Sequence, residues 1–308
     1  MKKVQFFIDD VIWLMRDLTR QKPSSMFDNP FLGALKKAHD NYGVKTQLNL
    51  FYRTSFFYGD DDFSLKDMTD AYKSEWESAS DWLKLAFHSK EEFPDYPYVN
   101  ASYDLVKSNY EQITNEIKRF AGEKSIAVGI VPHWAPISFD GVRALKDCGA
   151  TVTYATYGDT FVSDDTSYLP YGHDVRYIMN KKPETMFFRR HEREGGAENA
   201  ICSYNHITNE QFDSINDNMK LVKDEKTGMY FNNACHIILN LCSLEELPRI
   251  LAEFSENEYI NIGNHEQYFY PDYFNYQPDY AEKIYLMGKI LSEAGYEFIF
   301  MEDMVDYQ

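Results

Sequence analysis

Cysteine is scarce in this chain of 308 residues, and no two cysteines have the spacing of a metal or redox motif. A Cys-x-x-Cys pair would indicate a zinc site or a catalytic dithiol, and none is present. The four cysteines have mostly apolar or small neighbours, so we expect reduced and largely buried thiols, as in a cytoplasmic protein. They are Cys148, Cys202, Cys235 and Cys242.

Long hydrophobic runs are also missing, which argues against a membrane protein and against a secretory signal. No window reaches the ~18 apolar residues of a membrane-spanning helix. The first apolar run ends at Ile8 and is followed by Asp9-Asp10, with no small-residue cleavage site. We therefore expect a cytoplasmic location and no membrane partner.

Positive charge is in short supply as well. The chain has 31 Lys and Arg against 49 Asp and Glu, which gives a formal net charge of −18. Nucleic-acid backbones and anionic membrane surfaces attract basic proteins, so we expect neither as a partner. No glycine-rich phosphate loop follows a predicted strand, and a nucleotide cofactor therefore has no support.

The chain does contain enough apolar residues for a large core. Hydrophobic residues make up 44% and aromatic residues 16% of the sequence, which is typical of a folded globular protein. No repeat, low-complexity tract or Gly/Ser linker divides it. We predict one catalytic domain over residues 1–308, a length that suits a single α/β barrel.

Short apolar runs alternate with segments of helical period, which predicts an α/β fold with a parallel sheet. Strands are expected over Val4–Ile8, Lys45–Phe51, Leu83–Phe87, Ile126–Val131, Thr151–Tyr157, Thr185–Phe188, His236–Leu241, Tyr259–Ile262 and Glu297–Met301. Helices are expected over Phe31–Tyr42, Tyr103–Ala121, Asp140–Cys148, Leu244–Phe254 and Asp279–Ala294. With about seven or eight repeats, a (β/α) barrel is the leading architecture, and an open doubly wound sheet is the alternative.

Polar residues follow several of the predicted strands. The carboxyl ends of parallel strands are where such folds gather their catalytic groups. The polar groups found there are Asp9-Asp10, Arg53, His88, His133-Trp134 and His265-Glu266. Together they outline one polar rim that could bind a metal and move protons.

Asp9-Asp10 is the most informative pair. Two adjacent carboxylates repel each other, and a bound cation relieves that repulsion. One aspartate could then ligate a metal while the other acts as a base. The alternative is that an aspartate caps a helix starting near Val11.

His88 is a second candidate ligand. Glu92 lies four residues later, on the same face if the turn is helical, and Asp95 follows after a proline. Either carboxylate could complete a site of mixed imidazole and carboxylate ligands, which suits Zn, Mn, Fe, Co or Ni. The alternatives are a half-buried structural histidine and solvated glutamates.

His133 and His265 could each be either a core residue or part of a site. The aromatic stretch from Tyr268 to Tyr276 follows His265 closely, so we expect it to overhang the same mouth. Its rings could stack on a sugar, or they could form the subunit interface of a homo-oligomer.

The order of these motifs resembles the metal-dependent polysaccharide deacetylase family, the nodulation-deacetylase homology group of the glycoside hydrolase/deacetylase superfamily. Phe7-Ile8-Asp9-Asp10 resembles its first motif, and Phe87-His88-Ser89 resembles the start of its second. The resemblance implies a distorted, often seven-stranded (β/α) barrel. It also implies that Asp9 is the general base, that Asp10 and His88 bind the metal, and that His265 is the acid.

Three positions depart from the family pattern, and the first is Val11, which replaces the glycine expected after the aspartate pair. Glu92 stands where the second motif has its second metal histidine, so Glu92 and Asp95 both stay open as the third ligand. Val131-Pro132-His133-Trp134 sits where the family has an arginine-proline motif that lines the groove, but no arginine precedes Pro132. The resemblance implies a divalent transition metal, Zn first, with Mn, Co, Ni or Fe as alternatives.

We therefore expect a metal-dependent hydrolase that removes an acyl group from an N- or O-acylated carbohydrate. The residues expected to bind the sugar are Arg53, His133, Trp134 and Tyr268. One alternative is a barrel that binds carbohydrate without catalysis. Another is a metal-independent glycoside hydrolase that uses Asp9 or Asp10 with Glu266.

Overall fold

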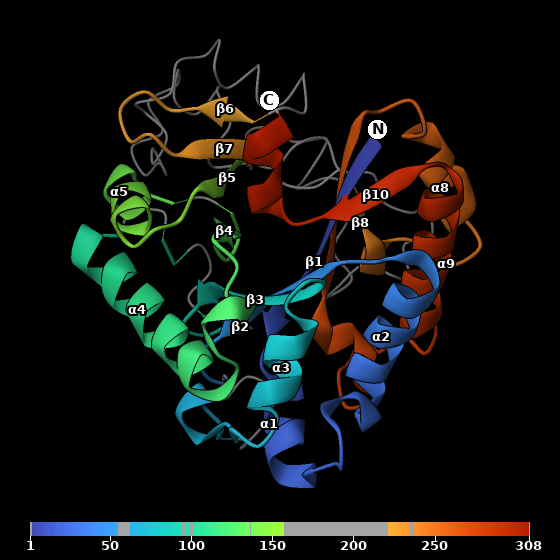
Figure 1. The fold of residues 1–308 in the computed structure, drawn as a ribbon, viewed down its shortest axis with the longest axis horizontal. Helices are drawn as coiled ribbons and strands as arrows, with labels where there is room; N and C mark the ends of the chain where they lie inside the picture. The colour runs from blue at the N-terminus through green and yellow to red at the C-terminus, as the bar shows by residue number, and fades with distance from the viewer. Residues whose placement is uncertain are drawn as a thin grey trace.

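The computed structural model describes residues 2–54, 62–93, 97–98, 101–135, 137–156, 221–233 and 237–307. Within these residues the chain forms an α/β fold with a mostly parallel central sheet (Figure 1). The predicted fold class is therefore confirmed. The strand predicted at Thr185–Phe188 lies outside the described residues.

Strand β1 (Lys2–Val11) lies at the centre of the larger sheet. It pairs in parallel with β9 (Tyr259–His265) on one side. On the other side it pairs with β10 (Tyr296–Ile299) at its beginning and with β2 (Thr46–Phe51) at its end. A strand covered on both faces needs a near-continuous apolar run, and Val4–Ile8 supplies one.

The larger sheet continues in parallel from β2 to β3 (Leu83–Ser89) and from β9 to β8 (Ile237–Ile238). A second sheet contains, in spatial order, β4 (Gly129–Ile130), β5 (Val152–Thr156), β7 (Tyr230–Asn233) and β6 (Val222–Lys223). Its last pair, β7 and β6, is antiparallel. An isolated parallel bridge between Leu85 and Ile126 joins β3 to the segment before β4.

The spatial order of the strands follows the chain from β1 through β2, β3, β4 and β5 to β7, and β8 and β9 lie on the other side of β1. This is the order of a (β/α) barrel, except for β10, the last strand in the chain, which pairs with β1 on the side of β2. Among the residues that the structure describes, no pairing joins β7 to β8. The closed, seven-stranded barrel therefore stays a prediction.

Helices cover the outside of the strands, with α2 against α9 on one side and α4 against α5 on the other (Figure 1). They are α1 (Trp13–Gln21), α2 (Pro30–Tyr42), α3 (Lys73–Ala79), α4 (Tyr103–Phe120), α5 (Phe139–Asp147), α8 (Leu247–Glu253) and α9 (Tyr280–Glu293). The five predicted helices are confirmed as α2, α4, α5, α8 and α9, within one turn of the predicted bounds.

Both ends of helix α2 carry local sequence signals that make the helix predictable. Asn29 Oδ1 accepts the N–H groups of Phe31 (2.9 Å) and Leu32 (3.3 Å), and Pro30 is the first helical residue. Gly43 ends the helix with a φ of 68°, a conformation that glycine adopts without strain. The asparagine-proline start and the glycine end are thus local signals that the structure uses as expected.

The sequence does not predict α3, β6 or β7, and it indicates α1 only through the alternative that an aspartate caps a helix starting near Val11. Neither α1 nor α3 has a capping hydrogen bond from the side chain of its own N-cap residue, which is the local signal that marks α2. The strand predicted at His236–Leu241 is shorter than expected, because Leu239–Leu241 forms a 3-10 turn, and His236 lies outside the described residues.

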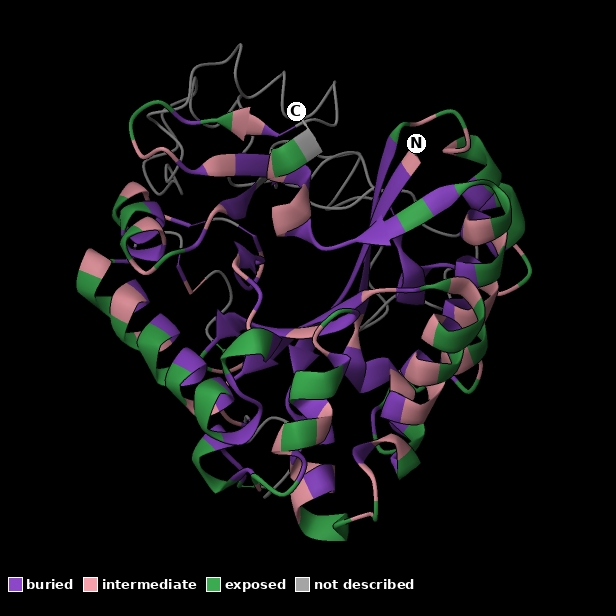
Figure 2. Cartoon of the chain, in the orientation of Figure 1, coloured by how far each residue is buried: buried purple, intermediate pink, exposed green. Residues whose placement is uncertain are grey.

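Buried residues concentrate in the strands and on the inward sides of the helices (Figure 2). Cys148 is half-buried and Cys242 is buried, and neither forms a disulfide, while Cys202 and Cys235 lie outside the described residues. No helix in the described part of the chain is both long enough and apolar enough to cross a bilayer.

Candidate metal centre

A bulge in β1 brings both aspartates of the Asp9-Asp10 pair to the same place. The register between β1 and β2 shifts between Ile8 and Val11, and Asp10 has a left-handed backbone with a φ of 64°. Adjacent residues of a regular strand point to opposite faces. Here Oδ1 of Asp9 and Oδ1 of Asp10 lie 3.8 Å and 3.1 Å from nitrogens of His88. The conformation costs a non-glycine residue about 1–3 kcal/mol, and such strain is concentrated at functional sites.

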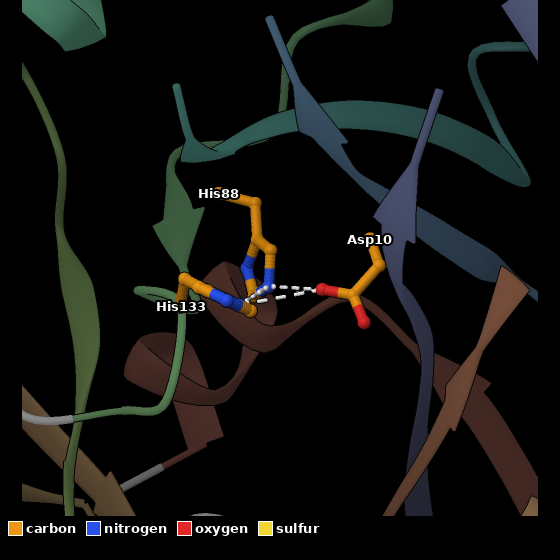
Figure 3. A group of neighbouring side chains, drawn as sticks. All are labelled: Asp10, His88 and His133. Carbon is orange, nitrogen blue, oxygen red and sulfur yellow. Dashed lines mark hydrogen bonds and ion pairs between the residues drawn. The ribbon is translucent and has the colours of Figure 1, made fainter. Parts of the chain in front are cut away.

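Three buried side chains then bring their ligand atoms together: Asp10, His88 and His133 (Figure 3). Asp10 comes from the end of β1, His88 from the end of β3 and His133 from the turn after β4. Nε2 of His88 lies 3.1 Å from Oδ1 of Asp10 and 3.1 Å from Nδ1 of His133. Nδ1 of His133 lies 3.3 Å from the same Asp10 oxygen.

Backbone carbonyls fix which nitrogen of each histidine faces the group. Nδ1 of His88 donates to the carbonyl of Val131 (2.6 Å), and Nε2 of His133 donates to the carbonyl of Glu92 (3.0 Å). A carbonyl only accepts, so these two nitrogens carry hydrogens. The lone pairs of His88 Nε2 and His133 Nδ1 therefore face each other and the Asp10 carboxylate. These electron-rich atoms repel one another unless a cation or a proton lies between them.

The distances fit a metal ion. Two donor atoms that each lie about 2.0–2.1 Å from one metal ion are about 2.8–3.4 Å apart, with octahedral angles at the short end and tetrahedral angles at the long end. All three separations in the group fall in this interval. Two imidazoles and one carboxylate form a donor set that zinc, manganese, iron, cobalt and nickel all accept. The residues thus fit a divalent transition metal.

The charges in the group also favour a cation. Burial lowers the pKa of His88, but Asp9 and Asp10 outweigh burial and raise it to about 9. Burial raises the pKa of Asp10, but hydrogen bonds from His133 and His88 hold it well below its usual range. Burial raises the pKa of Asp9, against the attraction of His88. Without a metal, the group therefore keeps a proton where the cation would lie.

In protein stripped of metal, we expect the free energy of unfolding to fall as the pH rises from about 6.5 through about 9. Folded His88 keeps its proton up to about pH 9, whereas unfolded histidine releases it near pH 6.5. The stabilisation by protonated His88 is complete below pH 6.5 and is lost as the pH passes about 9, by up to about 3 kcal/mol. Urea unfolding in excess EDTA across this range measures the slope.

Two histidine variants serve as controls for that measurement. His88→Gln removes the titrating group and should flatten the slope. His39→Gln replaces a histidine that stacks on Trp82 at a centroid distance of 4.4 Å, and it should keep the slope. Equal slopes in the wild type and in His88→Gln would contradict the expectation.

Buried amide groups hold Asp9 in place. Asn49 Nδ2 donates to Asp9 Oδ1 (2.6 Å). Gln47 Nε2 donates to Asn49 Oδ1 (2.7 Å) and to the carbonyl of Gly129 (2.9 Å). The amino group of Gln47 uses both of its hydrogens in this way, so Asn49 presents its oxygen to Gln47 and its amino group to Asp9. Asp9 is therefore oriented by a neutral donor.

His265 stands directly beside Asp9, its partner in the ladder between β1 and β9. It is half-buried, and its Nδ1 donates to Oδ1 of Asn240 (2.9 Å). Tyr268 packs next to it, with a centroid distance of 6.3 Å. Because Nδ1 carries the hydrogen bond, Nε2 is the nitrogen left to exchange a proton.

Glu92 is not one of the three grouped side chains, although it is buried next to them. Its backbone carbonyl holds the ring of His133, and its carboxylate makes a long contact of 3.5 Å to Gln267 Nε2. Asp95, the other residue predicted as third ligand, lies outside the described residues. In the structure, Glu92 contributes to the group through its backbone.

The residues predicted to bind sugar have separate environments. His133 joins the candidate metal ligands. Arg53 forms a two-point ion pair with Glu91 (3.0 and 2.5 Å), and this hydrogen bonding raises the pKa of Arg53. Trp134 follows His133 in a left-handed conformation with a φ of 63°. Tyr268 is buried in the interior of the molecule.

Three residues of the centre were not assigned their place by the sequence analysis: His133 as a ligand, and Asn49 and Asn240 as supports. A signal existed for Asn49, because Gln47 and Asn49 are amide residues that alternate with Leu48 and Leu50 in a fully buried strand. Asn240 lies in a 3-10 turn inside a run that reads as a strand, and it offers no such signal.

Comparison with known proteins gives matches only in structure, since a scan against family models and a search of curated proteins find none. The 4-alpha-glucanotransferase from Thermococcus litoralis matches with a TM-score of 0.54 and 8% identity, over 100% of this chain and 41% of that one. This match supports the fold alone.

Two further matches are to enzymes acting on acyl groups. A family 4 acetyl xylan esterase from Clostridium thermocellum, in complex with a cobalt ion, has 12% identity and a TM-score of 0.44, over 99% of this chain and 91% of that one. The T48 deacetylase with substrate has 9% identity and a TM-score of 0.41, over 100% and 92%. At these TM-scores the two matches say nothing about the site of this chain.

Proposed function

We propose that this chain is a metal-dependent hydrolase that removes an acyl group from an N- or O-acylated carbohydrate. The observation that carries the proposal is the buried group of Asp10, His88 and His133, whose ligand atoms have the separations of a metal site. A second carboxylate, Asp9, and a histidine, His265, lie beside it. Metal, base and acid are the components that a metal-dependent hydrolysis of an amide or ester uses.

Asp10, His88 and His133 would hold the ion, and zinc is the ion we propose. When bound, a divalent metal supplies a Lewis acid for the acyl oxygen and lowers the pKa of a water ligand. The bonds from His88 to Val131 and from His133 to Glu92 keep both rings oriented. Such supporting hydrogen bonds also make the facing nitrogens more basic.

Asp9 and His265 would move the protons. Asp9, oriented by Asn49, takes the proton of the attacking water. His265, oriented by Asn240, gives a proton through Nε2 to the departing amine or alcohol. The two residues are direct neighbours across β1 and β9, so the base and the acid stand side by side.

The carbohydrate part of the proposal rests on the resemblance of the Asp9-Asp10 and His88 motifs to polysaccharide deacetylases. Arg53 and Trp134, which are only partly buried, are the residues proposed to contact the sugar, whereas Tyr268 is buried. The glycoside hydrolase alternative has no comparable support. It needs a second carboxylate open to substrate, and the carboxylate of Glu266 is fully buried and accepts three backbone N–H groups.

We expect acyl release to depend on a bound transition metal. Zinc-loaded protein should release acetate from a panel of O-acetylated and N-acetylated oligosaccharides, and removal of zinc with EDTA should abolish the release. Addition of Zn²⁺ or Co²⁺ should restore it. Acetate release and metal content, measured on the same samples, test the expectation.

Asp10→Asn removes a proposed ligand and should lose both zinc and activity. Full activity in EDTA, or in Asp10→Asn, would defeat the proposal. Failure to bind stoichiometric Zn²⁺ or Mn²⁺ would instead favour a carbohydrate-binding barrel without catalysis.

A further inference from the structure

The carboxylate of Glu266 is fully buried and binds the beginning of a helix from another part of the chain. Its Oε2 accepts the N–H groups of Ile12 (2.8 Å) and Trp13 (2.9 Å), and its Oε1 accepts that of Leu14 (2.7 Å). These are among the first N–H groups of α1, which have no partner within the helix. The N-cap residue, Ile12, has no capping side chain, so Glu266 supplies the cap from 254 positions away.

Both ends of this tether are next to the candidate centre. On one side, Ile12 follows Asp10 by two residues, immediately after the bulge where Asp10 has its left-handed backbone. On the other side, Glu266 directly follows His265, which pairs with Asp9 across the sheet. The carboxylate thus joins the two chain segments that carry the proposed base, ligand and acid.

A strained backbone persists only where surrounding interactions over-determine it. The ladder from β1 to β9 holds the chain up to Asp9, the pairing of Val11 with Leu50 in β2 holds it directly after Asp10, and the three bonds to Glu266 hold it from Ile12 onward. Asp10 lies between these fixed points. A carboxylate is suited to this task because it has two acceptor oxygens and a negative charge at the positive end of a helix.

We propose that Glu266 is a positioning residue that holds the Asp9-Asp10 bulge in the shape that binds the cation. The inference rests on the proposed function, since it assigns Glu266 a role toward the same metal. Glu266 does not touch the ligand atoms, so it acts through the backbone of residues 10–14. A glutamine has nearly the same shape and keeps one acceptor oxygen, but it turns an amino group toward the N–H groups at the other, so it weakens the tether without opening a cavity.

The test is a Co²⁺ titration followed by visible absorption, together with thermal unfolding of the metal-free protein, at about pH 8. Burial raises the pKa of Glu266 to about 7, so the carboxylate is ionised there. We expect Glu266→Gln to bind Co²⁺ about 10- to 100-fold more weakly, the effect typical of supporting residues, and to change the Co²⁺ spectrum.

Asn29→Ala is the matched control, because Asn29 is also a buried cap, on α2. It should lower the unfolding temperature and leave the Co²⁺ affinity and spectrum unchanged. If Glu266→Gln behaves like Asn29→Ala, Glu266 is only a structural cap and the inference is overturned. Should Glu266→Gln not fold, Glu266→Asp, which keeps the charge on a shorter arm, carries the same expectation.

Asp10→Asn separates this inference from the proposed function. Wild-type Co²⁺ binding in Asp10→Asn would overturn the metal centre itself. Loss of binding in Asp10→Asn with wild-type binding in Glu266→Gln would overturn only the role of Glu266.

Discussion

Replacing His133 with alanine is expected to weaken Zn²⁺ binding by more than about 100-fold, since residues that merely support a metal ligand already contribute about 10- to 100-fold. His133 Nδ1 lies 3.1 Å from His88 Nε2 and 3.3 Å from Asp10 Oδ1, and its other nitrogen is committed to the Glu92 carbonyl. The variant would leave two ligands facing a void. Competition with a chromophoric chelator measures the affinity.

The same experiment on Glu92 separates two ligand sets. Glu92→Gln keeps the backbone carbonyl that orients His133, so zinc affinity should stay within about threefold of the wild type. A change of that size is smaller than the roughly 10- to 100-fold loss that follows when a residue supporting a metal ligand is removed. His39→Ala, remote from the centre in α2, controls for the loss of a packed imidazole. Strong loss of zinc in Glu92→Gln, with wild-type affinity in His133→Ala, would mean that the third ligand is Glu92 and that the geometric assignment is wrong.

The contrast between Glu92 and His133 shows what a sequence reveals about a site. The ends of the strands can be predicted from the sequence, and catalytic groups gather at the carboxyl ends of parallel strands. The sequence therefore predicts one shared rim for Asp9, Asp10, His88, His133 and His265. The role of each residue depends on separations of a few tenths of an ångström, and no spacing rule supplies these. A motif-based analysis looks for the third ligand four or seven residues after His88, whereas the third side chain of the buried group, His133, comes from the turn after β4.

The bulge in β1 is a second feature that local sequence does not encode. The apolar run Val4–Ile8 predicts a buried central strand, and that is what forms. A left-handed residue is most often glycine, so an aspartate at φ 64° is held there by its surroundings. The tether from Glu266 belongs to those surroundings, and its sequence separation also explains why α1 lacks the local start signal that makes α2 predictable.

Replacing Asp9 with asparagine is expected to lower the rate of acyl release by about 10²- to 10⁴-fold, the usual contribution of a general base, and to leave zinc bound. The amide has the same shape, so it can still accept the bond from Asn49 through its oxygen. It cannot take a proton from water. Asp9 lies beside the ligand group without belonging to it. In this variant the rate of acyl release should therefore fall while the zinc affinity stays as in the wild type.

Asp224→Asn is the matched control for that separation. Asp224 is also a buried aspartate, but it accepts the N–H groups of Lys226 and Thr227 in the turn before β7, at the opposite edge from the carboxyl ends of the strands. Its loss should reduce stability and leave both zinc and rate as they are. A wild-type rate in Asp9→Asn with zinc bound would remove Asp9 as the base. Loss of zinc together with rate would place Asp9 among the ligands. The proton acceptor would then have to be another group at the same rim, such as His265, which pairs with Asp9 across β1 and β9.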